Sequence, residues 1–299
     1  MSRFPPSLLQ SLPFMEGQHR PALGIQALSP NSWIICDESL GEELELKREL
    51  LHRRRDEVLK LQNEDRAPAQ ELLRLLVSNL VEFHADRYAL QGNSITNLTT
   101  SEIWDVIDPA VHPLEVAARL VQEDLCLLTE ADNQYLLTGA AVCFPSNWHL
   151  AEKIGNSASA IHAPVADYNG KMAAAVNRFF EHLRPNRIVW RLNWSIQEQP
   201  ALFQPERLLC DQRIVAENAG SALWLRAERR TLLRLPMSNA IAFTIRTFVD
   251  RLQDVVVDAE VARKMGATIR SMPKATLDYR SMMPIMTPLL SWLDARAMI

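Results

Sequence analysis

Apolar and polar residues alternate along positions 188–196, which read IVWRLNWSI. The even-numbered positions are all apolar (Ile, Trp, Leu, Trp and Ile), whereas Arg191, Asn193 and Ser195 place polar side chains between them. A period of two residues over this length predicts a β-strand with one apolar face and one mostly polar face.

Four more strands are expected from similar patterns. Two apolar runs in residues 125–144 flank a polar turn at 130–134, which predicts a pair of neighbouring strands. Residues 221–236 and 239–249 predict two further strands that follow each other closely along the chain. A short strand is also expected at residues 32–37, which read SWIICD.

Apolar residues recur with helical spacing on both sides of these strands. In residues 38–61, Leu44, Leu51 and Val58 stand seven positions apart, which predicts a helix, and a second helix is expected from near Pro68. These two helices are expected to form an antiparallel hairpin. Further helical segments are predicted at residues 112–122, 147–155, 171–183, 257–270 and 282–297.

The order of these elements predicts the class of the fold. Two strands, several helices and then three strands favour an α+β fold, in which an antiparallel sheet carries its helices on one face. Residues 122–250 would form this core, with the helical region 1–121 packed on it and the helices of 251–299 following. We expect one integrated unit, because no linker or internal repeat separates these parts.

Composition narrows the functional class. The 299 residues carry a formal net charge of −4. The chain therefore lacks the excess of basic residues that would indicate a nucleic acid or an anionic membrane as partner. No run approaches the roughly 18 apolar residues of a membrane helix, and the N-terminal stretch lacks the apolar core of an export signal. The four cysteines are far apart, as expected for reduced thiols of a cytoplasmic protein.

His162 is the first candidate for chemistry, within the segment SAIHAPVADYNG. Pro164 disfavours helical backbone at the residue before it, so the histidine is expected on an extended segment. Small neighbours leave room beside the imidazole, as an axial metal ligand would need. A histidine that is hydrogen-bonded within the core is the alternative, and His149 is a second candidate ligand.

Charged residues of the predicted strands are the second group of candidates. Arg191 and Asn193 could line a pocket in which the arginine pairs with a carboxylate, or they could face water. Glu228 and Arg230 share a face of their strand and Arg229 opposes them. A buried carboxylate would bind a protonated amine, and an arginine would bind an anionic cofactor group. The alternative interpretation is that these charged residues lie on an exposed edge strand and protect it from pairing with other strands.

Several short segments, taken in order, resemble a known family. They read LKRELLHRRRDEV, ELLRLL, CFPSNWHLAEKIG, IHAPV, NRFFEHL, RLNWSI, LFQP, LRAERRTLLRLP and AIAFTIRT. Together they resemble the haem-dependent oxidative N-demethylase alpha-subunit family, over about residues 13–250. The resemblance implies a PAS-like fold that binds b-type haem, with His162 as the axial ligand.

The resemblance also implies an activity and partners. Family members use haem, O2 and two electrons to demethylate a small alkylamine similar to dimethylamine, with release of formaldehyde. Glu228 and Arg230 would then be catalytic, with Glu228 holding the amine cation. Cofactor contacts would come from Arg191, Asn193, Trp194, Arg229 and Phe243, with Trp190 as a further aromatic neighbour.

The electron donor must lie on another chain under this interpretation. The sequence has no GxGxxG fingerprint and no cysteine spacing for a cluster, so a separate reductase subunit with flavin and an iron–sulfur centre is expected. A haem or small-molecule sensor on the same PAS-like core, and a haem-free structural subunit, are the alternative functions.

Overall fold

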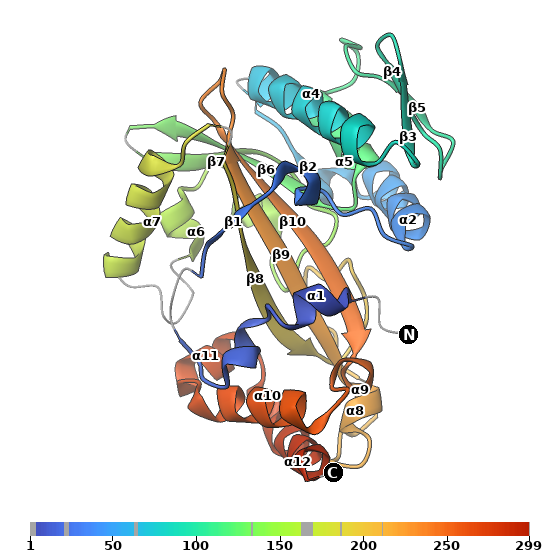
Figure 1. The fold of residues 1–299 in the computed structure, drawn as a ribbon. Helices are drawn as coiled ribbons and strands as arrows, with labels where there is room; N and C mark the ends of the chain where they lie inside the picture. The colour runs from blue at the N-terminus through green and yellow to red at the C-terminus, as the bar shows by residue number, and fades with distance from the viewer. Residues whose placement is uncertain are drawn as a thin grey trace.

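The computed structural model describes residues 4–20, 24–62, 65–132, 134–162, 170–185, 187–210 and 212–298 (Figure 1). Its strands form a seven-stranded sheet and a separate three-stranded sheet. The large sheet has the order β1-β8-β9-β10-β6-β7-β2, and all of its strand pairs are antiparallel. Together with the many helices, this sheet confirms the expected α+β fold.

Five strands of the large sheet were expected, and all five form. They are β6 (Asp124–Ala131), β7 (Gln134–Ala141), β8 (Ile188–Gln197), β9 (Trp224–Arg234) and β10 (Ile241–Arg251). The two edge strands, β1 (Gln26–Leu28) and β2 (Leu59–Lys60), come from the N-terminal region. The N-terminal region therefore completes the sheet at both edges and does not only cover it.

Most of the expected helices also form, with changed bounds at several positions. In the first half of the chain the α-helices are α1 (Pro6–Leu9), α2 (Leu40–Arg53), α3 (Arg55–Val58), α4 (Arg66–Phe83), α5 (Pro113–Leu120), α6 (Ala158–His162) and α7 (Gly170–His182). In the second half they are α8 (Ala219–Ala222), α9 (Leu252–Val255), α10 (Ala259–Ser271), α11 (Lys274–Tyr279) and α12 (Met286–Ala297). Short 3-10 helices are η1 (Pro13–Glu16), η2 (Pro30–Ser32), η4 (Leu150–Glu152) and η5 (Met283–Ile285).

Helices pack against both faces of the large sheet rather than against one (Figure 1). We call face A the side that carries Leu125, Leu192, Ala227 and Ala242. Helices α2, α4 and α5 cover one end of face A, and α1, η1, α10 and α12 cover its other end. Face B is the opposite side, where α6 and α7 pack over apolar residues of β6, β9 and β10.

Two local predictions were wrong. Within the described residues, 32–37 form no strand; instead, the backbone N–H groups of Ile35 and Asp37 donate to the side chains of Glu123 and Gln122. Because side chains satisfy these donors, no neighbouring strand is needed. Residues 147–155 contain only the 3-10 turn of η4 instead of an α-helix.

The smaller sheet was not expected from the sequence. It consists of β3 (Tyr88–Gln91), β4 (Ser94–Asn97) and β5 (Ile103–Asp105), paired in chain order. Ile95 in its middle strand is fully buried, whereas Ile103 is 66% exposed. These strands have three or four residues each, which is too short for alternation to be recognised in the sequence.

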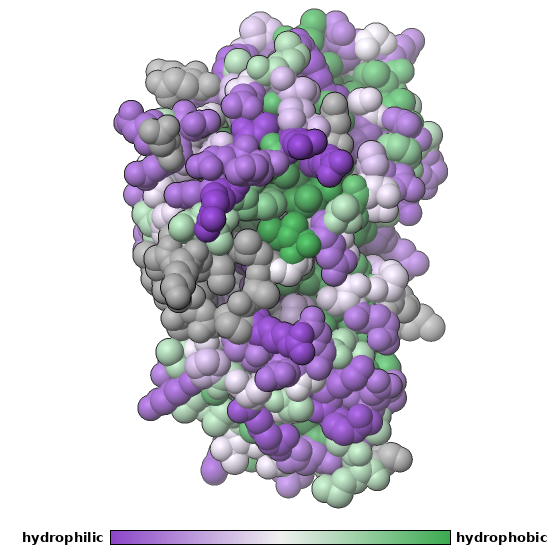
Figure 2. All heavy atoms as spheres, turned by 60° about the vertical axis from the view of Figure 1, so that its left-hand side comes forward, coloured by the Kyte–Doolittle hydropathy of each residue, from purple (hydrophilic) through white to green (hydrophobic). Residues whose placement is uncertain are grey.

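The face of the molecule shown in Figure 2 is mostly polar. Figure 2 turns the side of α6 and α7 toward the viewer and shows hydrophilic side chains over most of it, with apolar side chains in a patch near the middle. Among the described residues, none of the helices combines the length and the hydrophobicity that crossing a bilayer requires.

Candidate functional site

Polar side chains of three adjacent strands come together on face B. The register places Arg191 of β8 opposite Arg230 of β9, and Asn193 opposite Glu228. On β10, Ile245 lies opposite Arg230 and Thr247 lies opposite Glu228. Directly opposed residues of antiparallel strands lie on the same face, so these side chains form two neighbouring rows. We call Arg191, Asn193, Arg226, Glu228 and Arg230 the Arg191 cluster.

Glu228 is the carboxylate of this cluster and is only 8% exposed. Its Oε2 accepts hydrogen bonds from Arg230 Nε at 3.0 Å and Arg230 Nη2 at 2.5 Å, and its Oε1 lies 3.9 Å from Arg226 Nε. Burial alone would raise the pKa of Glu228, but the two guanidinium groups and a hydrogen bond from Asn193 hold that pKa below its usual range. Glu228 is therefore an ionised group that orients Arg230.

Arg226 lies beside Glu228 and is fully buried. Its Nη atoms donate to the backbone carbonyl groups of Phe144, Pro145, Ala201 and Leu202, at 2.6–3.2 Å. These bonds fasten two distant loops against the end of β9. Its Nε has no hydrogen-bond partner in the described part of the chain.

Arg191 differs from both of these arginines because its guanidinium forms no ion pair within the described ranges. Its buried Nε, like that of Arg226, has no hydrogen-bond partner there. Burial, together with the nearby cations Arg230 and Arg280, lowers the pKa of Arg191 to about 10, although Glu228 acts in the opposite direction. A desolvated guanidinium next to other cations is costly unless an anion joins it.

Phe243 borders the cluster, one row along face B. It lies opposite Leu232 and Cys126 in the sheet, and it packs against two groups of apolar side chains. One group contains Phe180 of α7, and the other contains Ile161 of α6. Both helices therefore meet the sheet beside Phe243.

His162 is the last residue of α6, so its backbone is helical and not extended as expected. The restriction that Pro164 imposes acts only on the residue directly before it, so a helix can continue up to His162. The side chain of His162, like residues 163–169, lies outside the described residues. The neighbouring Ile161 packs into the apolar group that contains Phe243, and this brings α6 to face B.

Two of the expected cofactor residues lie on the other face. Trp194 is 2% exposed on face A, where its ring meets the ring of Phe14 edge-on at 5.1 Å. Arg229 donates to the carbonyl groups of Trp33 and Ser32, and its guanidinium lies 5.5 Å from the centre of the Trp190 ring. The structure therefore brings together Arg191, Asn193, Glu228, Arg230 and Phe243, and it separates Trp190, Trp194 and Arg229 from them.

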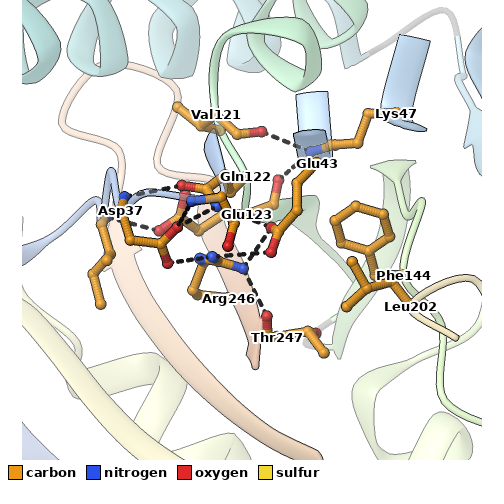
Figure 3. Close-up of polar contacts among 12 residues, drawn as sticks. Asp37, Glu43, Lys47, Val121, Gln122, Glu123, Phe144, Leu202, Arg246 and Thr247 are labelled. Carbon is orange, nitrogen blue, oxygen red and sulfur yellow. Dashed lines mark hydrogen bonds and ion pairs between the residues drawn. The ribbon is translucent and has the colours of Figure 1, made fainter. Parts of the chain in front are cut away.

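A second group of buried charges lies on face A (Figure 3). Arg246 of β10 donates to Asp37 at 2.5 Å and to Glu43 at 2.7 Å, while Gln122 donates to both carboxylates at 3.0 Å. Lys47 donates to the backbone carbonyls of residues 121 and 123. We call the six residues of this group the Arg246 cluster: Asp37, Glu43, Lys47, Gln122, Glu123 and Arg246.

Burial shifts the pKa of two carboxyl groups in the Arg246 cluster. It raises the pKa of both Glu43 and Glu123, with Arg246 opposing the change in each case. Glu123 Oε1 accepts from the backbone N–H of Ile35 at 3.0 Å. Sequence reasoning missed this cluster because its members are spread from residue 37 to 246 and form no local motif.

The described residues hold no group of three or more histidine, cysteine, aspartate or glutamate side chains placed to bind a metal ion. His149, the second candidate ligand, is 41% exposed and lies 3.6 Å from Glu206. The four cysteines are free thiols.

Comparison with known protein families identifies the chain. A family model described as "Haem-dependent oxidative N-demethylase, alpha subunit-like" matches residues 24–290. The match covers most of the chain, including β1 to β10 and the start of α12. That description indicates haem dependence, an oxidative demethylase-like activity and a partner subunit. The chain belongs to the haem-dependent oxidative N-demethylase alpha-subunit-like family.

Proposed function

We propose that the chain is the haem-binding subunit of an oxidative N-demethylase that acts on a small alkylamine, such as dimethylamine. Haem would bind on face B between the sheet and helices α6 and α7, on a core of PAS-like type. When bound, haem would supply the activation of O2 and the oxidation of the N-methyl group that releases formaldehyde. The chain itself would hold the haem, its substrate and the surrounding charges.

The unpartnered guanidinium of Arg191 is the observation that carries this proposal. Three guanidinium groups, of Arg191, Arg226 and Arg230, lie near Glu228, and among the described residues the only other carboxylate that acts on any of them is Asp124, which faces Arg226 and also accepts two backbone N–H groups. A propionate of b-type haem would supply the anion that Arg191 lacks, because guanidinium groups bind carboxylates through paired, charge-assisted hydrogen bonds. The donor set of the Arg191 cluster thus fits the anionic edge of a haem.

The apolar side of the site fits the porphyrin. Phe243 and Ile245 lie in the rows next to Arg230, and α6 reaches the same region through Ile161. His162 follows Ile161 directly, so it is our proposed axial ligand. We leave Trp194 and Arg229 out of the proposed site, because face A holds them in other contacts.

Glu228 receives a different role from the one expected. Both guanidinium groups already engage its carboxylate, and the surrounding positive charge disfavours an additional ammonium group. We propose that Glu228 positions Arg230 toward a propionate and that Asn193, which hydrogen-bonds Glu228, supports this arrangement.

The electrons would come from a separate reductase subunit with flavin and an iron–sulfur centre. The thiols of Cys126 and Cys143 are buried, and burial raises the pKa of each well above its usual value. Cys36 and Cys210 are half-buried and lie in other parts of the chain. The support for a second chain as the donor is the family description, which names an alpha subunit.

The test is a haem titration of the purified protein followed by its absorption spectrum. We expect a Soret band in the wild type and in His149→Ala, and its loss or a changed ligand signature in His162→Ala. His149→Ala is the matched control because that histidine lies at the surface. Loss of the band in His149→Ala alone would transfer the ligand role to His149, and a wild type that never binds haem would overturn the proposal.

A further inference from the structure

Arg234 is the last residue of β9 and lies on face B, beyond the Arg191 cluster. The register places it opposite Ile241 of β10, and the row of Leu232 and Phe243 separates it from the row of Arg230. Its side chain is buried, with 5% exposure. A buried guanidinium is costly unless its donors are satisfied, so its partners show what it holds.

All five N–H groups of this guanidinium have neutral acceptors. Its Nε donates to the backbone carbonyl of Leu183 at 2.6 Å. Its Nη2 donates to the carbonyl of Phe180 and, at 2.9 Å, to the hydroxyl of Tyr135. Its Nη1 donates to the carbonyl and to the Oδ1 of Asn239, both at 2.9 Å. Lysine has three N–H donors and could not make this set of bonds.

Two of these acceptors belong to the C-terminal end of α7. The helix ends at His182, and the last carbonyl groups of a helix have no N–H partner within it. Arg234 donates to the carbonyl of Phe180 inside the last turn and to that of Leu183 just after it. Its positive charge also complements the negative end of the helix dipole. Arg234 is therefore a cap that fastens the end of α7 to β9.

The turn between β9 and β10 holds the guanidinium in place. Asn239 has a φ of 61°, in the left-handed region that asparagine adopts more readily than most residues, and both of its oxygens accept from Nη1 of Arg234. The backbone N–H of Leu235 donates to the carbonyl of Ala240 at 2.8 Å, which closes the turn beside Arg234. The cap of α7 thus starts from a fixed part of the sheet.

The end of α7 that Arg234 holds adjoins the proposed haem site. Phe180 belongs to a group of packed apolar side chains that includes Ala158 of α6, and Phe243 packs against the same group. His162 follows Ala158 by about one turn of α6. A displaced α7 would therefore disturb both the apolar wall beside Phe243 and the helix that carries the proposed axial ligand.

We propose that Arg234 is a positioning residue of the haem site, which fixes α7, and through it α6, at the distance from the sheet that the cofactor requires. This inference rests on the proposed function, because it takes face B as the haem site. Arg234 acts through the helices and does not touch the haem, since the row of Leu232 and Phe243 lies between it and the Arg191 cluster.

The first measurement is amide hydrogen exchange of the haem-free protein. In Arg234→Met the amides of α7 should exchange at least about tenfold faster than in the wild type, because the end of the helix loses its cap and opens locally. The amides of α10, which packs on face A, are the internal reference and should change less. Unchanged exchange in α7 would overturn the inference, because Arg234 would then not hold the helix.

The second measurement is a haem titration with Arg229→Met as the matched control. Arg229 lies on the same strand, is 2% exposed and also donates to backbone carbonyl groups, but on face A. Arg234→Met should bind haem about tenfold more weakly and with a shifted Soret band. Arg229→Met should lose stability yet keep the haem affinity and the band position. Equal effects of both variants on haem would make Arg234 a structural residue only and overturn the inference.

A conservative variant keeps the test decisive if Arg234→Met does not fold. Arg234→Lys retains the charge with fewer donors, so its haem affinity and its exchange in α7 should lie between those of the wild type and Arg234→Met. Haem binding by the wild type that neither variant at Arg234 alters would overturn the positioning role alone. A wild type that never binds haem would overturn the proposed function, and the positioning role with it.

Discussion

The two faces of the central sheet bury charge in opposite ways. On face A, Arg246 meets the carboxylates of Asp37 and Glu43, and Gln122 bridges the same two groups. On face B, Arg226 and Arg230 lie against Glu228, and the buried Asp124 also acts on Arg226. Arg191 forms no ion pair in the described ranges, and its buried Nε has no acceptor there. The arginines lie on adjacent strands of one sheet, on β10 for face A and on β8 and β9 for face B, so the main difference lies in their partners.

We propose that this difference separates a structural cluster from a binding cluster. The Arg246 cluster links the N-terminal region to β10 through ion pairs of Arg246 with two carboxylates, although Arg246 Nε and Glu123 Oε2 are also buried without a hydrogen-bond partner in the described residues. The Arg191 cluster carries surplus positive charge at partly buried positions, and an anionic ligand would supply its counter-charge. Each of the predictions below tests one side of this comparison.

The largest expected effect belongs to Arg246. Replacing it by Met removes the guanidinium and leaves Asp37 and Glu43 without their cation, although burial already raises the pKa of Glu43. Breaking a buried pair in this way costs about 3–5 kcal/mol. Denaturant unfolding of Arg246→Met should therefore show a large loss in the free energy of unfolding.

Arg270→Met is the matched control for that experiment. Arg270 pairs with Asp294 at 2.6 Å, but both side chains are 47% exposed. An exposed pair contributes about 0–1 kcal/mol, so this variant should lose little. If Arg246→Met were no less stable than Arg270→Met, the Arg246 cluster would not be the structural element we describe.

The sequence reveals these two clusters unequally. Strict alternation in β8 places Arg191 and Asn193 on one face and Trp194 on the other, and this follows from the period of the pattern. Alternation also separates Arg229 from Glu228 and Arg230, but it cannot say which face binds a cofactor. That choice depends on which helices cover each face, and these come from distant segments.

The Arg246 cluster shows why the rest was not predictable. Its residues lie between positions 37 and 246, and each one alone looks like an ordinary charged residue on a helix, loop or strand. The segment 32–37 looked like a strand because its apolar residues are buried, yet its N–H groups find partners in Gln122 and Glu123. Long-range side-chain partners of this kind leave no periodic signal in the sequence.

The pH dependence of stability should have opposite signs for the two clusters. The guanidinium groups lower the pKa of Glu228 from its usual 4.5, so its contribution is present above pH 4.5 and is lost as the pH falls through its folded pKa. Burial raises the pKa of Glu43 from 4.5, so its contribution is complete below pH 4.5 and is lost as the pH rises through its folded pKa. A tenfold difference between the acid constants of the folded and unfolded states corresponds to about 1.4 kcal/mol of stability.

Unfolding measured between about pH 3 and 8 for the wild type, Glu228→Gln and Glu43→Gln tests these signs. The stability difference between wild type and Glu228→Gln should shrink toward acid pH, and the difference for Glu43→Gln should shrink toward neutral pH. If the stability differences of the two variants from wild type changed in the same direction with pH, the predicted contrast between the clusters would be wrong.

The smallest effect on stability is expected at Arg191. Without haem, Arg191→Met removes a desolvated cation whose Nε has no acceptor in the described structure, so the free energy of unfolding should change by no more than about 1 kcal/mol or should rise. The same variant should bind haem about 10- to 100-fold more weakly, because one charge-assisted contact to a propionate is lost. Arg187→Met, at an exposed position just before β8, should alter neither quantity. If Arg191→Met lost as much stability as Arg246→Met and bound haem unchanged, Arg191 would have a structural role. The buried charges on the two faces of the sheet would then both stabilise the fold.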